Sequence, residues 1–325
     1  MLRVLRAAVL LAVSMLLACG PASAEEAYPS KPVRVVVPFP PGGPADLIAR
    51  LIGQKLSETL GKQFYVENHS GAGGNLGTSI AARAPGDGYT IMITSQALVI
   101  NTSLYKSLPY DPNKDFIAVT RIATTPNVLV VNPDVPAKTV KELVELIRKE
   151  PGKYSTYAQP GIGTPSHLSG ELFKLSQHLN LTSVPFGGGG PMVQSVVAGH
   201  TPIAFSSLAP AAALIQGGKM RALAVTAEKR VDSLPDVPTM AEAGYPGQLG
   251  ETPIGILVPA GTSKEVIELL HGKVAQILKD ADVRQKLGAI GFSPIGDSPA
   301  EFSALLHDEG VKWAKVIKDA GITPQ

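Results

Sequence analysis

The groups best placed to do chemistry are the backbone amides of a proline- and glycine-rich loop, PFPPGGPAD at residues 38–46. The β-branched run at 33–37 before it predicts a short buried strand. Apolar residues at helical spacing follow the loop as far as Leu56, and Gly61 supplies a stop. The loop therefore opens into a helix N-terminus, where unpaired N–H groups and a partial positive charge favour an anion.

The same plan recurs at residues 154–175, where YSTYA predicts a strand, QPGIGTP a loop and SHLSGELFKL a helix. Thr164 or Ser166 can cap that helix, and Pro165 suits its first turn. One such loop alone is weak evidence, because any strand–helix connection has this shape. Two of them, from different halves of the chain, could face each other across a cleft.

Several polar side chains near these loops have two interpretations. His167 can cap and pack its helix or contact a ligand. Asp46 lies in a first helical turn, where it favours the helix dipole, and it can hold the loop from behind. Polar groups at two strand ends can bind a polar ligand or cap helices; these are Ser95 and Gln96, and Ser206 and Ser207.

No catalytic motif is present. The sequence has no G-x-S-x-G, H-E-x-x-H or G-x-x-x-x-G-K. The glycine-rich stretch at 71–77 misses the dinucleotide spacing because Leu76 stands where glycine is needed, so it is either a backbone-donor loop or a tight turn. The six histidines are not spaced as metal ligands on one helix face. We therefore expect no catalytic residue, no metal site and no cofactor.

Residues 1–24 are predicted to be a signal peptide. They combine two arginines, an apolar run at 7–17 too short to span a membrane, and the small-x-small cleavage site at 22–24. A competing interpretation is the lipobox-like sequence at 16–19, in which Cys19 would be lipidated. We favour soluble export. Cys19 is the only cysteine, so a soluble mature chain has no disulfide.

The charge balance of the mature chain argues against nucleic acid. The full chain has 29 Lys and Arg against 27 Asp and Glu. Two of the arginines belong to the signal peptide, so the mature chain is formally neutral and has no basic tract. Its length after cleavage is sufficient for two domains.

Short apolar runs alternate with helical patterns along the chain. The runs that predict strands are 63–67, 90–94, 117–123, 127–131, 154–158, 182–186, 203–205, 222–226 and 254–258. The patterns that predict helices are 139–150, 165–175, 191–198, 264–279 and 299–318. This alternation favours an α/β fold with mostly parallel sheets. Residues 126–132 and 244–252 are predicted crossings between two domains, and Trp313 is predicted to be core.

At this level of detail the chain resembles the periplasmic substrate-binding proteins of tripartite tricarboxylate transporters, the Bug family. The resemblance extends over residues 28–322. Seven segments carry it: VPFPPGGPAD (37–46), VENHSGAGGNLG (66–77), DGYT (87–90), LPYDPNKDF (108–116), HLSGELF (167–173), GKMRALAVT (218–226) and LPDVPTMAEAGYPG (234–247).

The resemblance implies a type II-like, two-domain Venus flytrap of α/β architecture with two crossing segments. We expect domain 1 at 25–126 and 250–325, and domain 2 at 127–249. It further implies that residues 39–46 and 161–167 grip one carboxylate of a small di- or tricarboxylate or aromatic acid, through backbone N–H groups and ordered water. The expected partners are this ligand and the integral membrane permease of a tripartite transporter, and we expect a monomer in the periplasm.

The ligand-binding residues expected from these arguments are Phe39, Pro40, Gly42, Gly43, Pro44, Ala45, Asp46, Ser95, Gln96, Gly161, Gly163, Thr164, Ser166, His167, Phe186 and Ser206. Three positions depart from the common family pattern and remove polar side chains: Ala45, the loop at 186–188 and the loop at 161–163. We therefore expect a ligand whose distal part is less polar than citrate, such as an aromatic or aliphatic dicarboxylate.

Two other functions stay open from the sequence. The family resemblance also permits a ligand sensor that acts on a membrane signalling receptor. An enzyme acting on a small organic acid is disfavoured because neither loop contains a nucleophile–base pair, although single acid–base residues escape sequence patterns.

Overall fold

A computed structural model describes residues 28–324. The expected signal peptide and Cys19 lie outside the described residues. One compact unit begins at Lys31 and includes all the elements discussed below.

The unit contains ten strands and ten α-helices within the described residues. The strands are β1 (Val33–Val37), β2 (Phe64–Asn68), β3 (Thr90–Ser95), β4 (Phe116–Val131), β5 (Thr156–Gln159), β6 (Thr182–Pro185), β7 (Ile203–Ser207), β8 (Arg221–Val225), β9 (Glu251–Pro259) and β10 (Ser293–Pro294). The helices are α2 (Pro44–Leu60), α3 (Asn75–Ala82), α4 (Ala97–Leu104), α5 (Val140–Lys149), α6 (Pro165–Ser176), α7 (Gly189–Val197), α8 (Leu208–Gln216), α9 (Lys264–Ile277), α10 (Ala281–Ala289) and α11 (Pro299–Asp319), and a 3₁₀ turn precedes α3. In the part of the chain described, no helix combines the length and the apolar character needed to cross a bilayer.

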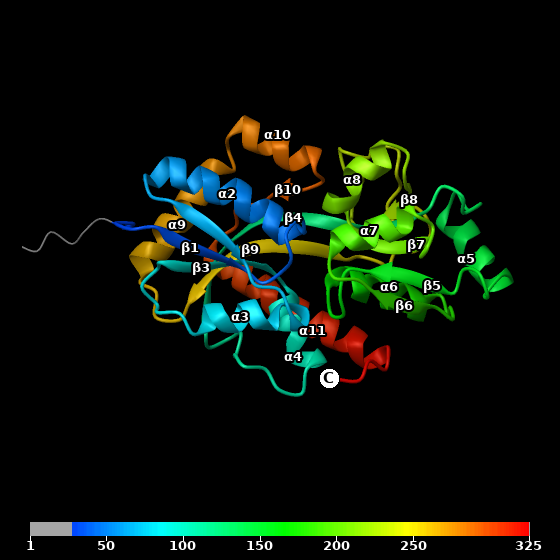
Figure 1. Cartoon of the computed structure of the whole chain (residues 1–325), viewed down its shortest axis with the longest axis horizontal. Coiled ribbons are helices and arrows are strands. Elements are labelled where there is room, and N and C mark those ends of the chain that lie inside the picture. The colour runs from blue at the N-terminus through cyan, green and yellow to red at the C-terminus, as the bar shows by residue number, and fades with distance from the viewer. Residues whose placement is uncertain (1–27, 325) are drawn as a thin grey trace, which may run out of the picture. The chain divides into compact units, whose positions relative to one another are not determined.

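The strands form one mixed sheet in the order β2-β1-β3-β9-β4-β7-β5-β6, with β8 and β10 also paired to β4. The α/β fold class is confirmed, but the prediction of mostly parallel sheets is wrong. The pairs β1–β2, β1–β3, β5–β6 and β5–β7 are parallel, whereas every pair that includes β4 or β9 is antiparallel. The two long strands β4 and β9 can be followed side by side in Figure 1.

Strand β4 replaces two predicted strands. Residues 117–123 and 127–131 belong to one strand that runs through Pro126. Before Pro126 the strand pairs with β9, and after it with β7 and β8. The missing N–H of the proline therefore falls where the neighbours change, a place at which a strand tolerates it. The division into two domains near this point stays a prediction.

The first strand–loop–helix unit forms as its sequence predicts. Four of the five residues of β1 are buried. Pro44 occupies the first turn of α2, and Gly61 ends the helix in the left-handed conformation with φ of 70°. Trp313 is fully buried on α11, in a cluster that includes Ile100 and Leu168. This places it in the core, as expected.

Candidate ligand-binding site

Asp46 holds the first loop from behind. Its carboxylate accepts the Gly42 N–H at 2.9 Å, the Asn68 amide at 2.9 Å and the Arg50 guanidinium at 2.9 Å. Asn68 also donates to the carbonyl of Phe39 at 3.0 Å. Burial pushes the pKa of Asp46 up, but these hydrogen bonds outweigh it and hold the pKa below its usual value. The loop is thus tied at both ends to β2 and α2.

The second loop is fixed by its own helix. The Thr164 hydroxyl donates to the Gly161 carbonyl at 2.7 Å and accepts the His167 N–H at 3.3 Å, so Thr164 is the helix cap. The Gly163 N–H donates to Nδ1 of His167 at 3.2 Å. Gln159 accepts the Gly161 N–H at 2.5 Å. His167 therefore has a structural role in the loop, which is the first of the two interpretations given by the sequence.

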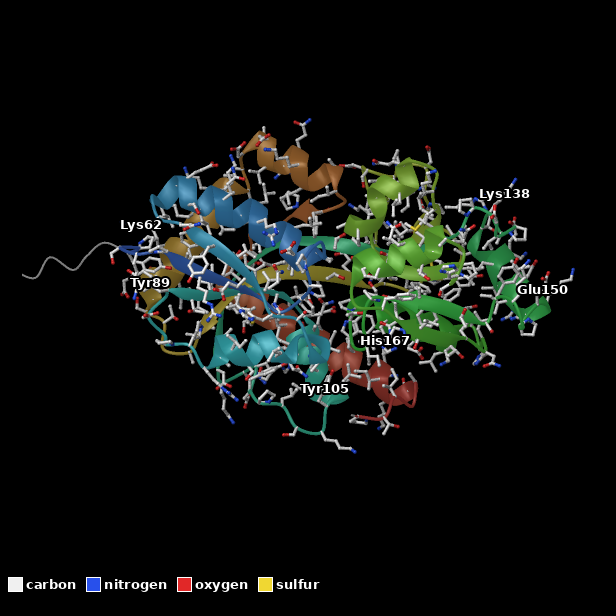
Figure 2. All side chains as sticks on the ribbon, in the orientation of Figure 1. Lys62, Tyr89, Tyr105, Lys138, Glu150 and His167 are labelled. Carbon is white, nitrogen blue, oxygen red and sulfur yellow. The ribbon has the colours of Figure 1, made fainter. Side chains whose placement is uncertain are left out.

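His167 carries no positive charge at neutral pH. Its side chain is almost wholly buried at the start of α6 (Figure 2), and this burial lowers its pKa to about 4 from the usual 6.5. Glu171 opposes the shift without cancelling it. An anion near the loop is accordingly not paired with an imidazolium.

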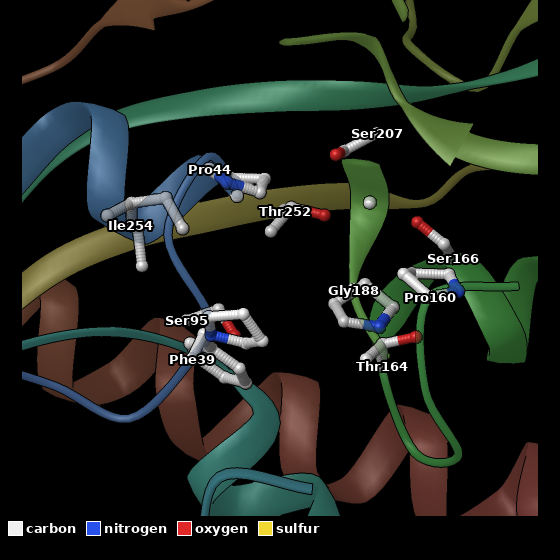
Figure 3. A pocket seen from close by; sticks show the side chains of 15 residues that line it. Phe39, Pro44, Ser95, Pro160, Thr164, Ser166, Gly188, Ser207, Thr252 and Ile254 are labelled. Atoms are coloured by element: carbon white, nitrogen blue, oxygen red, sulfur yellow. The ribbon is translucent and has the colours of Figure 1, made fainter. Parts of the chain in front are cut away.

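Both loops line one cavity of about 80 Å³ (Figure 3). Eight of the expected ligand-binding residues are among its walls: Phe39, Pro40, Gly43, Pro44, Ala45, Ser95, Thr164 and Ser166. They come from the first loop and α2, the end of β3, and the start of α6. The structure therefore brings together two segments more than a hundred residues apart in the sequence.

The other eight expected residues do not line this cavity. Gly42 and Asp46 belong to the first loop and are hydrogen-bonded to each other, while Gly161, Gly163 and His167 shape the second loop. Whether any of the sixteen residues contacts a ligand stays a prediction.

The remaining three of these eight residues, Gln96, Phe186 and Ser206, make contacts within the surrounding elements. The Gln96 amide donates to the Glu251 carbonyl at 2.9 Å, which joins α4 to β9. Phe186 packs against the core around Met192. Ser206 is fully buried, and its hydroxyl donates to the Ser207 carbonyl.

Seven lining residues were not in the expected set: Pro160, Pro165, Gly188, Gly189, Ser207, Thr252 and Ile254. Gly188 and Gly189 begin α7, two residues before the predicted start of that helix. Ser207 is the last residue of β7, and the alternation of side chains along a strand puts its neighbour Ser206 on the other face. Thr252 lies in a segment interpreted as a crossing, where the sequence gives no signal that a side chain faces a cavity.

The described wall of the cavity combines helix N-termini with uncharged hydroxyl side chains. Residues at the N-termini of α2, α6, α7 and α8 all contribute. The first N–H groups of a helix have no partner within it, and the helix dipole is positive there. Of the fifteen described residues that form the wall, none carries an ionisable side chain. Such a wall can bind an anion through backbone amides and hydroxyl groups.

The sequence profile described as "Tripartite tricarboxylate transporter family receptor" (TctC) matches residues 48–322. The chain belongs to this family. Its members are periplasmic solute-binding receptors, and the family and structural neighbours of this receptor are binding proteins.

Individual relatives are similar to this chain over nearly its full length. Protein BugT of Bordetella pertussis is 33% identical, with 93% of each chain covered. The R. palustris protein Rpa4515, solved with adipate, is 37% identical with a TM-score of 0.88, over 92% of this chain and all of that one. MatC of Rhodopseudomonas palustris, solved with bound malate, is 32% identical with a TM-score of 0.83, over 89% of this chain and all of that one. The receptor thus has the periplasmic binding protein fold and is a member of the Bug family.

Proposed function

We propose that this receptor captures a small carboxylate in the periplasm and delivers it to the membrane permease of a tripartite tricarboxylate-type transporter. The observation that carries the proposal is the convergence of four helix N-termini on one cavity whose described wall has no ionisable side chain. Backbone N–H groups there supply the positive potential that a carboxylate needs, and no cationic side chain is required.

The expected grip on the first carboxylate involves the starts of α2 and α6. Gly43, before α2, has no side-chain cap, which leaves the N–H groups of the first turn available. At α6, Thr164 takes the His167 N–H, and the N–H of Ser166 stays available at the cavity wall. The adipate and malate bound by the two R. palustris relatives support a carboxylate ligand.

The remainder of the wall favours a ligand less polar than citrate. Phe39, Pro40, Pro160 and Ile254 give apolar surface, and the polar side chains present are hydroxyls. A third carboxylate would lose its water without a cation to compensate it, which is costly in an apolar environment. An aliphatic or aromatic dicarboxylate suits this wall better.

Delivery rests on a change between open and closed states. We propose that domain 1 (25–126 and 250–325) and domain 2 (127–249) close over the ligand about β4 and β9. The ligand favours closure only through better contacts in the closed state. The receptor acts as a binder and not as an enzyme in this proposal.

A thermal-shift panel of mono-, di- and tricarboxylates tests the binding. A ligand at about 100 times its dissociation constant adds about 2.7 kcal/mol to the free energy of unfolding. We expect the largest shifts from aliphatic or aromatic dicarboxylates. No shift with any carboxylate would overturn the proposal, and a larger shift with citrate would overturn its specificity. Delivery is tested by the uptake of radiolabelled ligand. We expect cells that lack the receptor gene to take up less of it than wild-type cells.

A further inference from the structure

Strand β9 has a cavity on each of its faces. Thr252 and Ile254 line the candidate site. Glu251 and Pro253, which alternate with them along the strand, line a second cavity of about 690 Å³. Pro126 of β4 lies opposite Glu251 and lines the second cavity too. This second cavity, the rear cavity, is therefore separated from the candidate site by the two strands about which closure is proposed.

The rear cavity has one wall from each proposed domain. The domain 2 wall is the segment 226–232 that follows β8, and the domain 1 wall comes mainly from the start of β4 and from α11. Both walls have charged side chains of both signs: Glu228, Lys229, Arg230 and Asp232 on the domain 2 wall, and Arg121, Glu309 and Lys312 on the domain 1 wall. Each wall can therefore form ion pairs with the other.

Among the described residues, no ion pair connects the two walls. The three ion pairs that wall residues form each lie within one proposed domain: Arg121–Asp297, Lys312–Glu309 and Arg230–Glu242. Glu228 and Lys229 are exposed and have no ion pair with any described residue. These two side chains are thus available to pair across the rear cavity.

The carboxyl of Glu251, between the two walls, responds to charges on both. Burial raises its pKa, and Glu228 on the domain 2 wall raises it further. Arg121 and Lys312 on the domain 1 wall lower it. Glu228 therefore lies in the same electrostatic neighbourhood as two cations of the opposite wall.

The two proposed domains touch each other on the side of the candidate site. Gly163 packs so closely against Leu104 that a Cβ there would collide with the leucine side chain. A Cβ at Gly188 would lie 3.4 Å from the ring of Pro40. The structure is thus closed around the site. A rotation about β4 and β9 that widens the site narrows the rear cavity, because the two cavities lie on opposite faces of these strands.

We propose that Glu228 and Lys229 form ion pairs across the rear cavity when the site opens, and that these pairs stabilise the open state and lower the ligand affinity. Lys312 is the expected partner of Glu228, and Glu309 that of Lys229. The inference rests on the proposed function, since it takes domains 1 and 2 to close about β4 and β9. The apparent dissociation constant is the intrinsic one divided by the closed fraction, so an ion pair formed only in the open state weakens binding.

Calorimetric titration with adipate tests this role in the wild-type receptor and in the variants Glu228→Gln and Lys229→Gln. We expect each variant to bind adipate roughly two- to fivefold more tightly, as for the loss of one exposed ion pair from the open state. The two variants change the net charge in opposite directions. A direct effect of charge on an anionic ligand would therefore strengthen binding in one variant and weaken it in the other.

Glu145→Gln and Lys219→Gln are the matched controls. They make the same two charge changes at exposed positions of domain 2, where neither residue lines the rear cavity or has an ion pair with a described residue. We expect both controls to bind adipate as the wild-type receptor does.

Small-angle X-ray scattering without ligand tests the same proposal independently of binding. We expect Glu228→Gln and Lys229→Gln to have a smaller radius of gyration than wild type at low salt, because their closed fraction is larger. At about 1 M salt, where exposed ion pairs are screened, the wild-type value should approach that of the variants.

The outcomes separate the two proposals. Unchanged adipate affinity in both Glu228→Gln and Lys229→Gln, or shifts in opposite directions, overturns the role of the rear cavity while carboxylate binding stands. A wild-type receptor that binds no carboxylate overturns the proposed function. Scattering then decides on the rear cavity alone, and equal radii of gyration for wild type and both variants at low salt overturn its role.

Discussion

The side-chain amide of Asn68 donates to the Asp46 carboxylate at 2.9 Å and to the Phe39 carbonyl at 3.0 Å. A single nitrogen on β2 thereby joins the first turn of α2 to the loop that lines the cavity. The Gly42 N–H completes the arrangement by donating to the same carboxylate. Asp46 is 2% exposed and does not line the cavity. The conformation of the loop therefore depends on a buried carboxylate outside the cavity wall.

Replacing this carboxylate should loosen the loop. Asp46→Asn removes the charge that three donors share, so we expect a loss of roughly 1–3 kcal/mol in the free energy of unfolding. Carboxylate affinity should fall with it. Urea unfolding and ligand titration measure the two effects. Arg50→Ala is the control, because Arg50 is half-exposed and its loss should cost about 1 kcal/mol or less. Equal losses in both variants would contradict the importance of the Gly42 and Asn68 bonds.

The buried imidazole of His167 predicts a pH dependence of stability. Burial lowers its pKa to about 4 in the folded state, against 6.5 in the unfolded chain. Between these values the unfolded state binds the proton and the folded state does not, so the free energy of unfolding falls as the pH drops from 6.5 to 4. At about 1.4 kcal/mol per pKa unit, the loss is roughly 3 kcal/mol.

His167→Asn should flatten that part of the stability curve, because asparagine does not titrate and can still accept the Gly163 N–H. The difference between the two curves, from urea unfolding at several pH values, removes contributions from carboxylates. His178→Asn is the control: His178 is exposed and has φ of 51°, which asparagine tolerates. If the wild-type and His167→Asn curves run parallel from pH 6.5 to 4, the prediction is wrong.

Two glycines separate backbone strain from crowding. Gly163 has φ of 80° and Gly42 has φ of 81°, so alanine is strained equally at both. A Cβ at Gly42 meets nothing within 4 Å, whereas at Gly163 it collides with the side chain of Leu104. We expect Gly42→Ala to cost about 1–2 kcal/mol. Gly163→Ala should cost roughly 1–3 kcal/mol more. Urea midpoints at constant slope measure this, and equal midpoints would show that the second loop yields without cost.

Local patterns predicted the elements that hold the two loops. The valine run of β1 and the stop of α2 at Gly61 are local signals, and each is confirmed. Strand pairing is not local. Nothing near Pro126 indicates that β4 continues past it, because the reason is a change of neighbours supplied by residues far along the chain. The antiparallel direction of β9 arises in the same way.

The candidate cavity was predictable where it is made of loops. Glycine and proline mark the starts of α2 and α6, whereas Thr252 gives no such signal. It lies within a strand buried over nearly its whole length, so its polarity and spacing do not reveal which face meets the cavity. Ser207 is the last of the five residues of β7, all of which are buried, and this hides the alternation in the same way. Only the folded sheet shows that Ser207, and not Ser206, lines the cavity.

Calorimetric titration of the receptor with adipate and with adipamide, its uncharged diamide, tests the central claim most directly. Backbone N–H groups and hydroxyls facing the cavity should favour the charged ligand, by about tenfold for each carboxylate. We predict saturable binding of adipate and binding of adipamide weaker by about a hundredfold. Equal affinity for the two compounds, or no heat with adipate, would contradict the assignment of this cavity as a carboxylate site.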